Sequence, residues 1–299
     1  MIKVQNAVKY FDKFRALDGF NMNVEKGSIY GLVGPNGAGK TTVMNHLTGV
    51  LSPDEGTVKI DKKEVWENSP LKQRVLSIAD DWYYYGTYTI GDMAEFYENM
   101  YIRFNRERFE KLGEYFGMND KNQIRRMSKG MKKQVAFRLV LSCMPDVLIL
   151  DEPLDGLDPV MRKQIMNLII GDVSDREMTV LVSSHNLREL EDVCDHVGII
   201  HKGKMVIEKP LDDIKGNVHK YQIAFGGNFP QEIYHKLDIM HTQKLGSVYT
   251  FIIKGNDEFN DNVIKQFSPV VFDKVSLTLE EVFIYELGGL GYDFSKILV

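Results

Sequence analysis

The chain has 299 residues, 43% of them hydrophobic and 26% charged, a composition that predicts a globular protein with one large domain and room for a smaller one. Its formal net charge of −5 argues against a nucleic-acid-binding protein, because such proteins hold phosphates with a basic face. Two cysteines, Cys143 and Cys194, provide neither a disulfide framework nor metal-ligand spacing, so we expect buried free thiols in a reducing cytoplasm.

We expect no signal peptide and no transmembrane segment in this chain. The first ten residues, MIKVQNAVKY, lack the apolar run of a signal peptide. The best candidate for a membrane span, residues 136–153, is interrupted by Pro145, Asp146 and Asp151. An association with a membrane is therefore expected to run through a partner protein.

A predicted strand at residues 28–33 (SIYGLV) runs directly into the glycine-rich segment GPNGAGKTT, residues 34–42. The segment fits the phosphate-binding pattern G-x-x-x-x-G-K-[ST], and a helix-forming run follows it. Backbone N–H groups of such a loop turn toward phosphate oxygens, while Lys40 supplies a cation for the β and γ phosphates and Thr41 a hydroxyl for Mg²⁺. The predicted nucleotide contacts are Gly34, Asn36, Gly37, Ala38, Gly39, Lys40, Thr41 and Thr42.

The next chemical pattern lies at residues 147–153 (VLILDEP), a continuous apolar run typical of a parallel strand buried on both faces. It ends in Asp151, placed to hold Mg²⁺ through its water shell, and Glu152, placed to polarise an attacking water. Taken alone, the pattern also fits two strand-end caps. The following segments favour the chemical interpretation: LDGLDP at residues 154–159, and a predicted strand, VLVSSH, that ends in His185.

A serine-glycine turn, MSKGMKKQ at residues 127–134, lies between these motifs and precedes a predicted helix. The order of P-loop, S-x-G turn, acidic strand end, L-D turn and strand ending in His resembles the nucleotide-binding subunit of ABC transporters over about residues 1–210. The resemblance implies an α/β P-loop NTPase domain of the ABC ATPase type at residues 1–215, with a helical insertion at about residues 88–142. It also implies ATP and Mg²⁺ as cofactors, and ATP hydrolysis coupled to transport.

The same resemblance assigns roles to residues at a dimer interface. The signature motif is a variant of the usual one, namely Ser128, Lys129, Gly130 and Met131. As a helix N-terminus, it suits the γ-phosphate of an ATP bound to a second subunit. Asp158 would lie across that interface, and His185 would touch the γ-phosphate as a sensor or positioning group. A homodimer, or a heterodimer with a related subunit, is therefore expected.

The resemblance also implies an aromatic ring that stacks on adenine, within residues 9–20 (KYFDKFRALDGF). The spacing to Ala16 and Leu17 favours Phe11 over Tyr10, although either ring also fits a plain core position.

Residues 77–89, SIADDWYYYGTYT, place a run of aromatic rings beside two carboxylates, which alone fits either a buried edge or an exposed interface. In the family, a glutamine here senses Mg²⁺ and water and joins the site to the transmembrane partner. Counting from VLSIADD puts Asp80 at this position, and its ionised carboxylate can bind metal or water but donates no hydrogen bond. The following rings would then line the groove that receives a coupling helix of the permease: Trp82, Tyr83, Tyr84 and Tyr85.

After about residue 215 the motifs stop, and residues 216–299 are expected to form a small α+β domain. Strand-like segments at 221–225, 239–243, 248–253 and 270–275 alternate with helical segments at 229–237 and 256–267. This β-α-β-β-α-β order predicts a ferredoxin-like unit, closed by a helix at residues 276–287.

The combined pattern predicts an ATPase subunit of an ABC-2-type exporter, resembling the YtrB-type subgroup that serves antimicrobials or amphipathic peptides. It is expected at the cytoplasmic face of the membrane, bound through a transmembrane permease. One alternative is a soluble ABC ATPase, but paired nucleotide domains or a long coiled-coil insertion are not visible. The other is a non-hydrolysing regulator, which would be expected to have lost Glu152 or His185.

Overall fold

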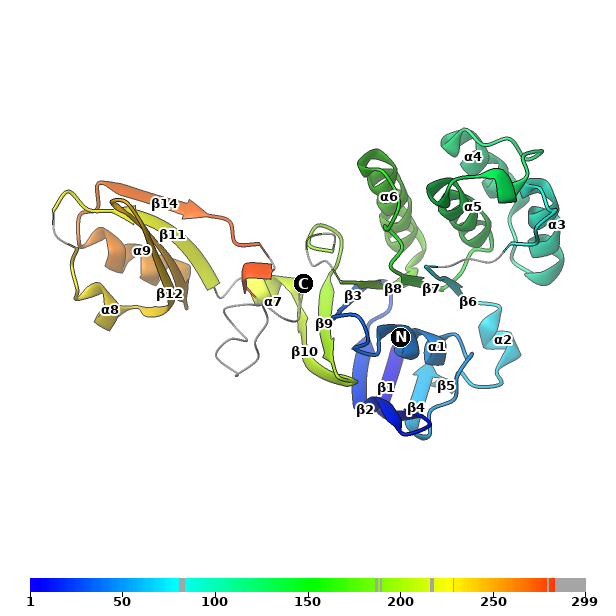
Figure 1. Cartoon of the computed structure of the whole chain (residues 1–299), viewed down its shortest axis with the longest axis horizontal. Helices are drawn as coiled ribbons and strands as arrows, with labels where there is room; N and C mark the ends of the chain where they lie inside the picture. Colours follow the sequence, from blue (N-terminus) through cyan, green and yellow to red (C-terminus); the bar gives the residue numbers. More distant parts are fainter. Residues whose placement is uncertain are drawn as a thin grey trace. The chain divides into compact units, whose positions relative to one another are not determined.

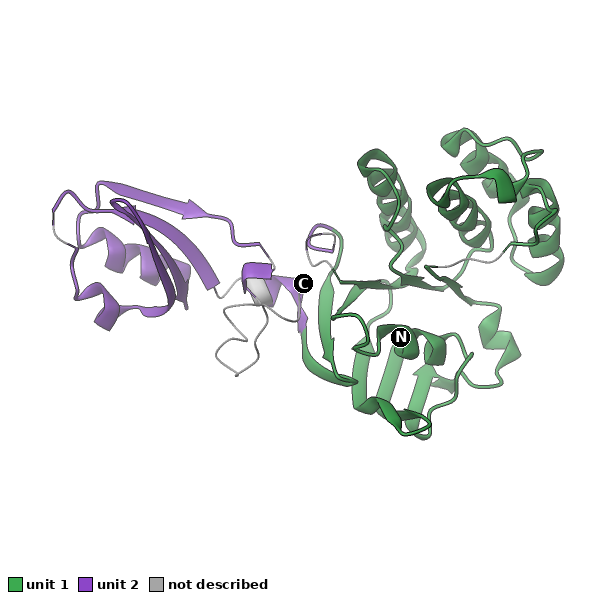
Figure 2. Ribbon diagram, in the orientation of Figure 1, with its two compact units in different colours: residues 1–185, 193–208 green, residues 186–192, 209–299 purple. Residues whose placement is uncertain are grey.

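The computed structural model describes residues 1–80, 84–185, 188, 190–215, 218–227, 229–278 and 280–282. Contacts within the chain divide it into two compact units, shown in Figure 2. Unit 1 comprises residues 1–185 and 193–208, and unit 2 comprises residues 186–192 and 209–299. Unit 2 thus begins ahead of the boundary predicted at residue 216, since helix α7 (Leu211–Lys215) contacts the first long strand of that unit.

A six-stranded sheet forms the centre of unit 1, in the order β10-β9-β3-β8-β7-β6. The neighbouring pairs β9-β3, β3-β8, β8-β7 and β7-β6 are all parallel. Every residue of β3 and β8 is buried, as expected for parallel strands covered on both faces. The strands are β3 (Ile29–Val33), β6 (Val75–Ile78), β7 (Val147–Asp151), β8 (Thr179–Ser184), β9 (His196–His201) and β10 (Lys204–Pro210).

An antiparallel sheet of order β2-β1-β4-β5 lies on the other side of helix α1 (Figure 1). Its strands are β1 (Ile2–Phe11), β2 (Phe14–Val24), β4 (Glu55–Ile60) and β5 (Lys63–Glu64). Helix α1 (Lys40–Leu47) contacts β2 and β4 of this sheet and β7 of the parallel sheet, so one apolar core joins both. A short helix, α2 (Ser69–Lys72), leads into β6.

Helices occupy most of residues 90–142, within the range expected for the helical insertion. It consists of α3 (Ile90–Met100), α4 (Arg106–Phe116), a 3-10 turn at Ile124–Arg126, and α5 (Lys129–Ser142). Arg138 of α5 is 2% exposed, donates to the Phe109 carbonyl at 2.9 Å, pairs with Asp120, and lies 3.6 Å from the Phe109 ring centroid. A Cβ at Gly113 would clash with this guanidinium, so glycine lets α4 and α5 pack around it. Helix α6 (Pro159–Arg176) follows β7.

Unit 2 contains a four-stranded sheet of order β12-β13-β11-β14 with antiparallel neighbours. Its elements are β11 (Val218–Ala224), α8 (Ile233–Lys236), β12 (Asp238–Leu245), β13 (Val248–Lys254), α9 (Asp257–Lys265) and β14 (Val271–Val275). Buried Tyr221, Phe251 and Ile264 belong to its core. The elements follow the predicted β-α-β-β-α-β order, and the ferredoxin-like classification stays a prediction. Residues 280–282 are helical, and the rest of the predicted closing helix beyond 282 lies outside the described residues.

Two further expectations concern the thiols and the membrane. Cys143 and Cys194 are buried free cysteines, as predicted, and burial raises the pKa of both thiols. Within the described part of the chain, every helix is too short or too polar to span a bilayer.

We expect Arg138→Met to lower the free energy of unfolding by about 1–3 kcal/mol, because the buried Phe109 carbonyl loses its donor. Thermal and urea unfolding of the full chain would measure the loss. Arg125→Met, at an exposed position of the same insertion, is the matched control and should change stability by less than about 0.5 kcal/mol. Equal stability of the two variants would show that the buried guanidinium does not hold α4 and α5 together.

Candidate nucleotide-binding and hydrolysis site

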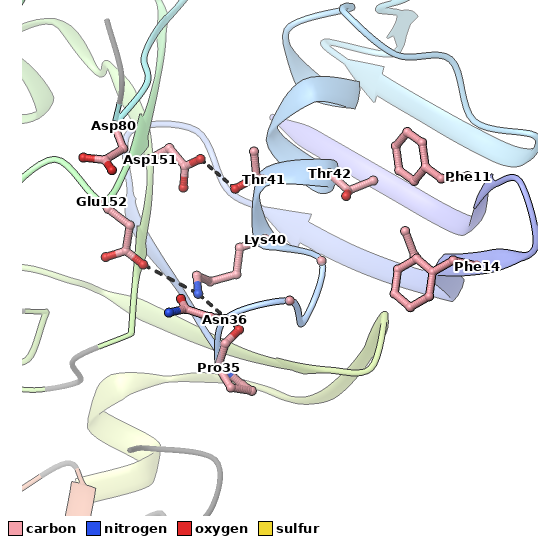
Figure 3. A pocket seen from close by; sticks show the side chains of 13 residues that line it. Phe11, Phe14, Pro35, Asn36, Lys40, Thr41, Thr42, Asp80, Asp151 and Glu152 are labelled. Carbon is pink, nitrogen blue, oxygen red and sulfur yellow. Dashed lines mark hydrogen bonds and ion pairs between the residues drawn. The ribbon is translucent and has the colours of Figure 1, made fainter.

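A cavity of about 330 Å³ opens where β1, the glycine-rich loop and the end of β7 meet (Figure 3). Aromatic rings lie at one end and acidic side chains at the other. The lining residues are Phe11, Phe14, Ala16, Pro35, Asn36, Gly37, Gly39, Lys40, Thr41, Thr42, Asp80, Asp151 and Glu152. The structure therefore brings together the P-loop and the acidic strand end that the sequence separates by more than a hundred residues.

The loop between β3 and α1 has the backbone that its glycines predict. Gly37 and Gly39 have φ values of 79° and 111°, a region that favours glycine. Gly34 and Ala38 do not line the cavity; a Cβ at Gly34 would clash with the Ile200 carbonyl oxygen, so this glycine serves close packing. Buried Lys40 begins α1, and its Nζ lies 2.6 Å from the Gly34 carbonyl oxygen.

The acidic pair is held by residues of α1, of β8 and of the bend that follows β8. The Asp151 carboxylate accepts hydrogen bonds from Thr41 Oγ1 at 2.8 Å and from Ser183 Oγ at 2.6 Å. The Glu152 carboxylate lies 3.6 Å from Lys40 Nζ and 3.0 Å from His185 Nδ1. Asp151 is thus oriented from both sides, while Glu152 lies between a cation and an imidazole.

Ser183 is a functional residue that the sequence analysis missed. Besides its bond to Asp151, its Oγ accepts the backbone N–H of Glu152 at 3.0 Å. The available signal was the pair of hydroxyl residues, Ser183 and Ser184, that ends an apolar run directly before His185.

Two exposed rings form the other end of the cavity. Phe11 ends β1 and Phe14 begins β2, and the two are paired across the turn. They are 44% and 63% exposed, so both rings offer accessible area on which a planar base could stack. The Tyr10 ring does not line the cavity and lies under the Arg15 guanidinium, 5.6 Å from it. Phe11 lines the cavity and Tyr10 does not, and Phe14 lines it too, a residue that the sequence analysis did not name. Stacking of adenine on Phe11 stays a prediction.

Asp80 follows β6 and lines the cavity near Glu152 (Figure 3). Its Oδ1 lies 3.1 Å from Lys129 Nζ and 3.2 Å from Lys133 Nζ. Partial burial alone would raise the pKa of Asp80, but the hydrogen bonds from Lys129 and Lys133 outweigh it and hold this pKa below its usual value. The carboxylate predicted to bind metal or water is therefore ionised and paired with two lysines of α5.

The described part of the aromatic segment contains one half-buried ring and one exposed ring, so each of the two interpretations given above fits part of it. Half-buried Tyr84 donates its hydroxyl to the Lys132 carbonyl at 2.5 Å, and burial raises its pKa. Tyr85 is 47% exposed, with its ring centroid 5.0 Å from that of Tyr88. Trp82 and Tyr83 lie outside the described residues.

A second hollow, of about 340 Å³, lies beside β6 and was not anticipated from the sequence. It is lined by Thr48, Val50, Lys72, Val75, Leu76, Ser77, Tyr97, Tyr101 and Val140. Val50, at its rim, is 64% exposed. The hollow thus combines apolar side chains from both the parallel-sheet core and the helical insertion.

The predicted signature residues do not line this chain's own nucleotide cavity, although Lys129 pairs with Asp80, which does. Ser128 caps α5 by accepting the Met131 N–H at 3.2 Å, and Met131 is 42% exposed. A Cβ at Gly130 would lie 2.9 Å from the Gly156 carbonyl oxygen, so the signature turn packs closely on the L-D turn. Asp158 caps α6 through the N–H groups of Val160 and Met161.

Comparisons with known proteins agree with this geometry. Residues 17–155 match the family model described as ABC transporter. The bacitracin transport ATP-binding protein BcrA of Bacillus licheniformis is 34% identical over 224 residues, 74% of this chain and 73% of the relative. The lantibiotic transport ATP-binding protein SrtF of Streptococcus pyogenes is 35% identical over 214 residues, 71% of this chain and 92% of the relative. The chain is an ATP-binding subunit of an ABC transporter.

Other comparisons cover more of this ABC ATPase or support its fold. The ABC transporter ATP-binding protein YtrB of Bacillus subtilis is 29% identical over 289 residues, 97% of this chain and 99% of the relative. A solved ATP-binding subunit of an ABC transporter superposes with a TM-score of 0.67 at 24% identity, covering 72% of this chain and 92% of that structure. The structure of cbiO1 from Clostridium perfringens superposes with a TM-score of 0.62 at 26% identity. The match covers 71% of this chain and 89% of that structure. The predicted family and P-loop ABC ATPase fold are confirmed.

If Phe11 stacks on adenine, Phe11→Ala removes about 1–3 kcal/mol of stacking free energy and raises the Kd for ATP about five- to 150-fold. Fluorescence titration with ATP would measure this change, and Phe14→Ala should weaken binding in the same direction. Tyr10→Ala is the control and should leave the Kd within about twofold. A larger loss for Tyr10→Ala than for Phe11→Ala would reverse the assignment.

Proposed function

We propose that this ABC ATPase dimerises around two ATP molecules with Mg²⁺ and drives a separate membrane permease that exports peptides, antimicrobials or other amphipathic compounds. The supporting observation is one cavity that joins exposed rings, a phosphate-binding loop and a carboxylate flanked by a cation and an imidazole. The substrate class follows the relatives whose names specify bacitracin and lantibiotic transport.

In the proposed reaction, Lys40 turns from the loop carbonyls toward the β and γ phosphates, and the loop N–H groups hold their oxygens. Glu152 orients and polarises the attacking water for in-line displacement. His185, 3.0 Å from the Glu152 carboxylate, positions that group and the γ-phosphate. Of the other predicted loop contacts, Asn36, Gly37, Gly39 and Thr42 line the same cavity.

The donor set fits Mg²⁺ bound together with a triphosphate. Thr41 and Asp151 provide one hydroxyl and one carboxylate within hydrogen-bonding distance of each other. Among the described residues, no group of three or more His, Cys, Asp or Glu side chains could hold a metal by itself. Mg²⁺ commonly uses few protein ligands plus phosphates and water, so the sparse set suits it. Bound Mg²⁺ would neutralise charge on the transferred phosphoryl group, and Asp80 would contribute through water.

We assign the signature residues to the ATP of a second subunit, in a homodimer or a heterodimer. Ser128, Lys129, Gly130 and Met131 present a capped helix N-terminus, which suits phosphate oxygens. None of the four lines this chain's own cavity, which supports a role across an interface, and the L-D turn that leads to Asp158 packs against Gly130.

The permease is proposed to dock on the hollow beside β6 and on the aromatic segment that follows Asp80. Exposed Val50 and Tyr85 offer the apolar and amphipathic area that interface cores favour. This contact would hold residues 1–215 at the cytoplasmic face of the membrane, while residues 216–299 form an accessory domain outside the nucleotide site.

Glu152→Gln should bind ATP but release phosphate about a hundredfold or more slowly, because the amide cannot accept a proton from water. Phosphate release and ATP-dependent dimerisation of the purified chain provide the measurement, and the variant should accumulate as an ATP-bound dimer. Glu191→Gln, a change outside the cavity, is the control. Phosphate release near the wild-type rate in Glu152→Gln would contradict the assigned role.

Tyr85→Ala should weaken assembly with the permease by about 1–4 kcal/mol if the ring is an interface hot spot, while leaving the melting temperature and ATP binding unchanged. Tyr84→Ala should instead lower the melting temperature, since its ring is half-buried and its hydroxyl is bonded to Lys132. Co-purification with the permease and thermal melting separate the two effects. If Tyr85→Ala lowers only the melting temperature, the exposed ring is a structural contact and not a docking one.

A further inference from the structure

Lys133 is a buried cation that does not line the nucleotide cavity and has no part in the chemistry described above. It lies in the second turn of α5, and its side chain is 3% exposed. Its Nζ donates to the Glu152 carbonyl oxygen at 2.7 Å and to Asp80 Oδ1 at 3.2 Å. Because a buried ammonium is costly without partners, these two oxygens make a lysine tolerable here. One atom thereby joins α5 to the ends of β6 and β7.

The Glu152 backbone is held in a conformation that it would not adopt by itself. Its φ is 45°, in the left-handed region that non-glycine residues rarely occupy. The N–H donates to Ser183 Oγ, and the carbonyl accepts from Lys133, so both sides of the residue are fixed. Strained backbone persists only where its surroundings over-determine it. Since the backbone sets the direction of the Cα–Cβ bond, this clamp fixes the direction in which the Glu152 side chain starts toward the cavity.

Asp80 provides the second contact of Lys133, and its partly exposed carboxylate has room to move. The Asp80 carboxylate is 42% exposed, and its Oδ1 is shared with Lys129 Nζ at 3.1 Å. The segment proposed to meet the permease begins directly after Asp80. A movement of Asp80 would therefore change the charge beside Lys133, and through it the hold on the Glu152 carbonyl.

We propose that Lys133 is a positioning residue for ATP hydrolysis, which holds Glu152 in its strained conformation and transmits the position of Asp80 to it. This inference rests on the proposed role of Glu152 as the group that polarises water. Lys133 does not line the nucleotide cavity, and in this proposal it acts through the Glu152 backbone.

Lys133→Met removes the ammonium and keeps an unbranched side chain. In the full chain, kcat for ATP hydrolysis should fall about tenfold or more, while the Kd for a non-hydrolysable ATP analogue changes by less than about threefold. A merely structural role would shift the melting temperature and both constants together. Lys132→Met, on the same helix and half-buried, is the matched control and should hydrolyse ATP at the wild-type rate.

Lys133→Gln, which is neutral and shorter, is the second variant in case Lys133→Met does not fold. It should show the same fall in kcat with the Kd preserved. A wild-type kcat in either folded variant overturns the proposal, and so does a parallel loss of ATP affinity.

Two further variants separate the roles of Asp80, Lys133 and Glu152. Asp80→Asn should lower kcat by a smaller factor in the Lys133→Met chain than in the wild-type chain, because the part of its effect that runs through the ammonium is already lost. If the two single substitutions lower kcat by factors that multiply in the double variant, Asp80 does not act through Lys133. If Glu152→Gln hydrolyses ATP normally, the proposed function of Glu152 is itself wrong. If Glu152→Gln is slow but Lys133→Met is not, only the positioning role fails.

Discussion

The parallel pairing of β3, β8, β7 and β6 is the constraint on which the site depends. Because the strands run in one direction and nearly in register, their carboxyl ends meet at one edge of the sheet. The P-loop leaves β3 there, Asp151 ends β7 beside Ser183 of β8, and Asp80 follows β6. Segments that are far apart in the sequence therefore share one cavity, and helix α1 holds the phosphate-binding loop against them.

At this edge, hydroxyl groups orient the Asp151 carboxylate, and hydrogen bonds to its N–H and carbonyl hold the Glu152 backbone. Ser183 serves both carboxylate residues, since it donates to Asp151 and accepts from the Glu152 N–H. The left-handed backbone of Glu152 is the strained point of the site, and Ser183 and Lys133 fix it from opposite sides. The neighbours of Glu152 thus help to set the position of its carboxylate. Such pre-organisation is expected of the group that is proposed to polarise water.

The sequence predicted the elements whose physical signals are local. Glycine spacing identified the P-loop, and a buried apolar run ending in Asp151 and Glu152 identified β7. It did not predict Lys133, because charged residues in a helix are usually solvated, and its partners are far away in the sequence. Phe14 was missed because its partnership with Phe11 appears only when the β1-β2 turn closes. The hollow beside β6 likewise collects side chains from separate elements, which no local pattern reveals.

The central claim is that one cavity aligns ATP between the exposed rings, the P-loop and Glu152. A crystal structure of the Glu152→Gln chain with ATP and Mg²⁺ tests it most directly. The account predicts adenine against Phe11, the γ-phosphate within hydrogen-bonding distance of Lys40 and His185, and Ser128 of a second subunit at the same phosphate. An adenine ring away from Phe11, or a γ-phosphate out of reach of residue 152, would contradict the account.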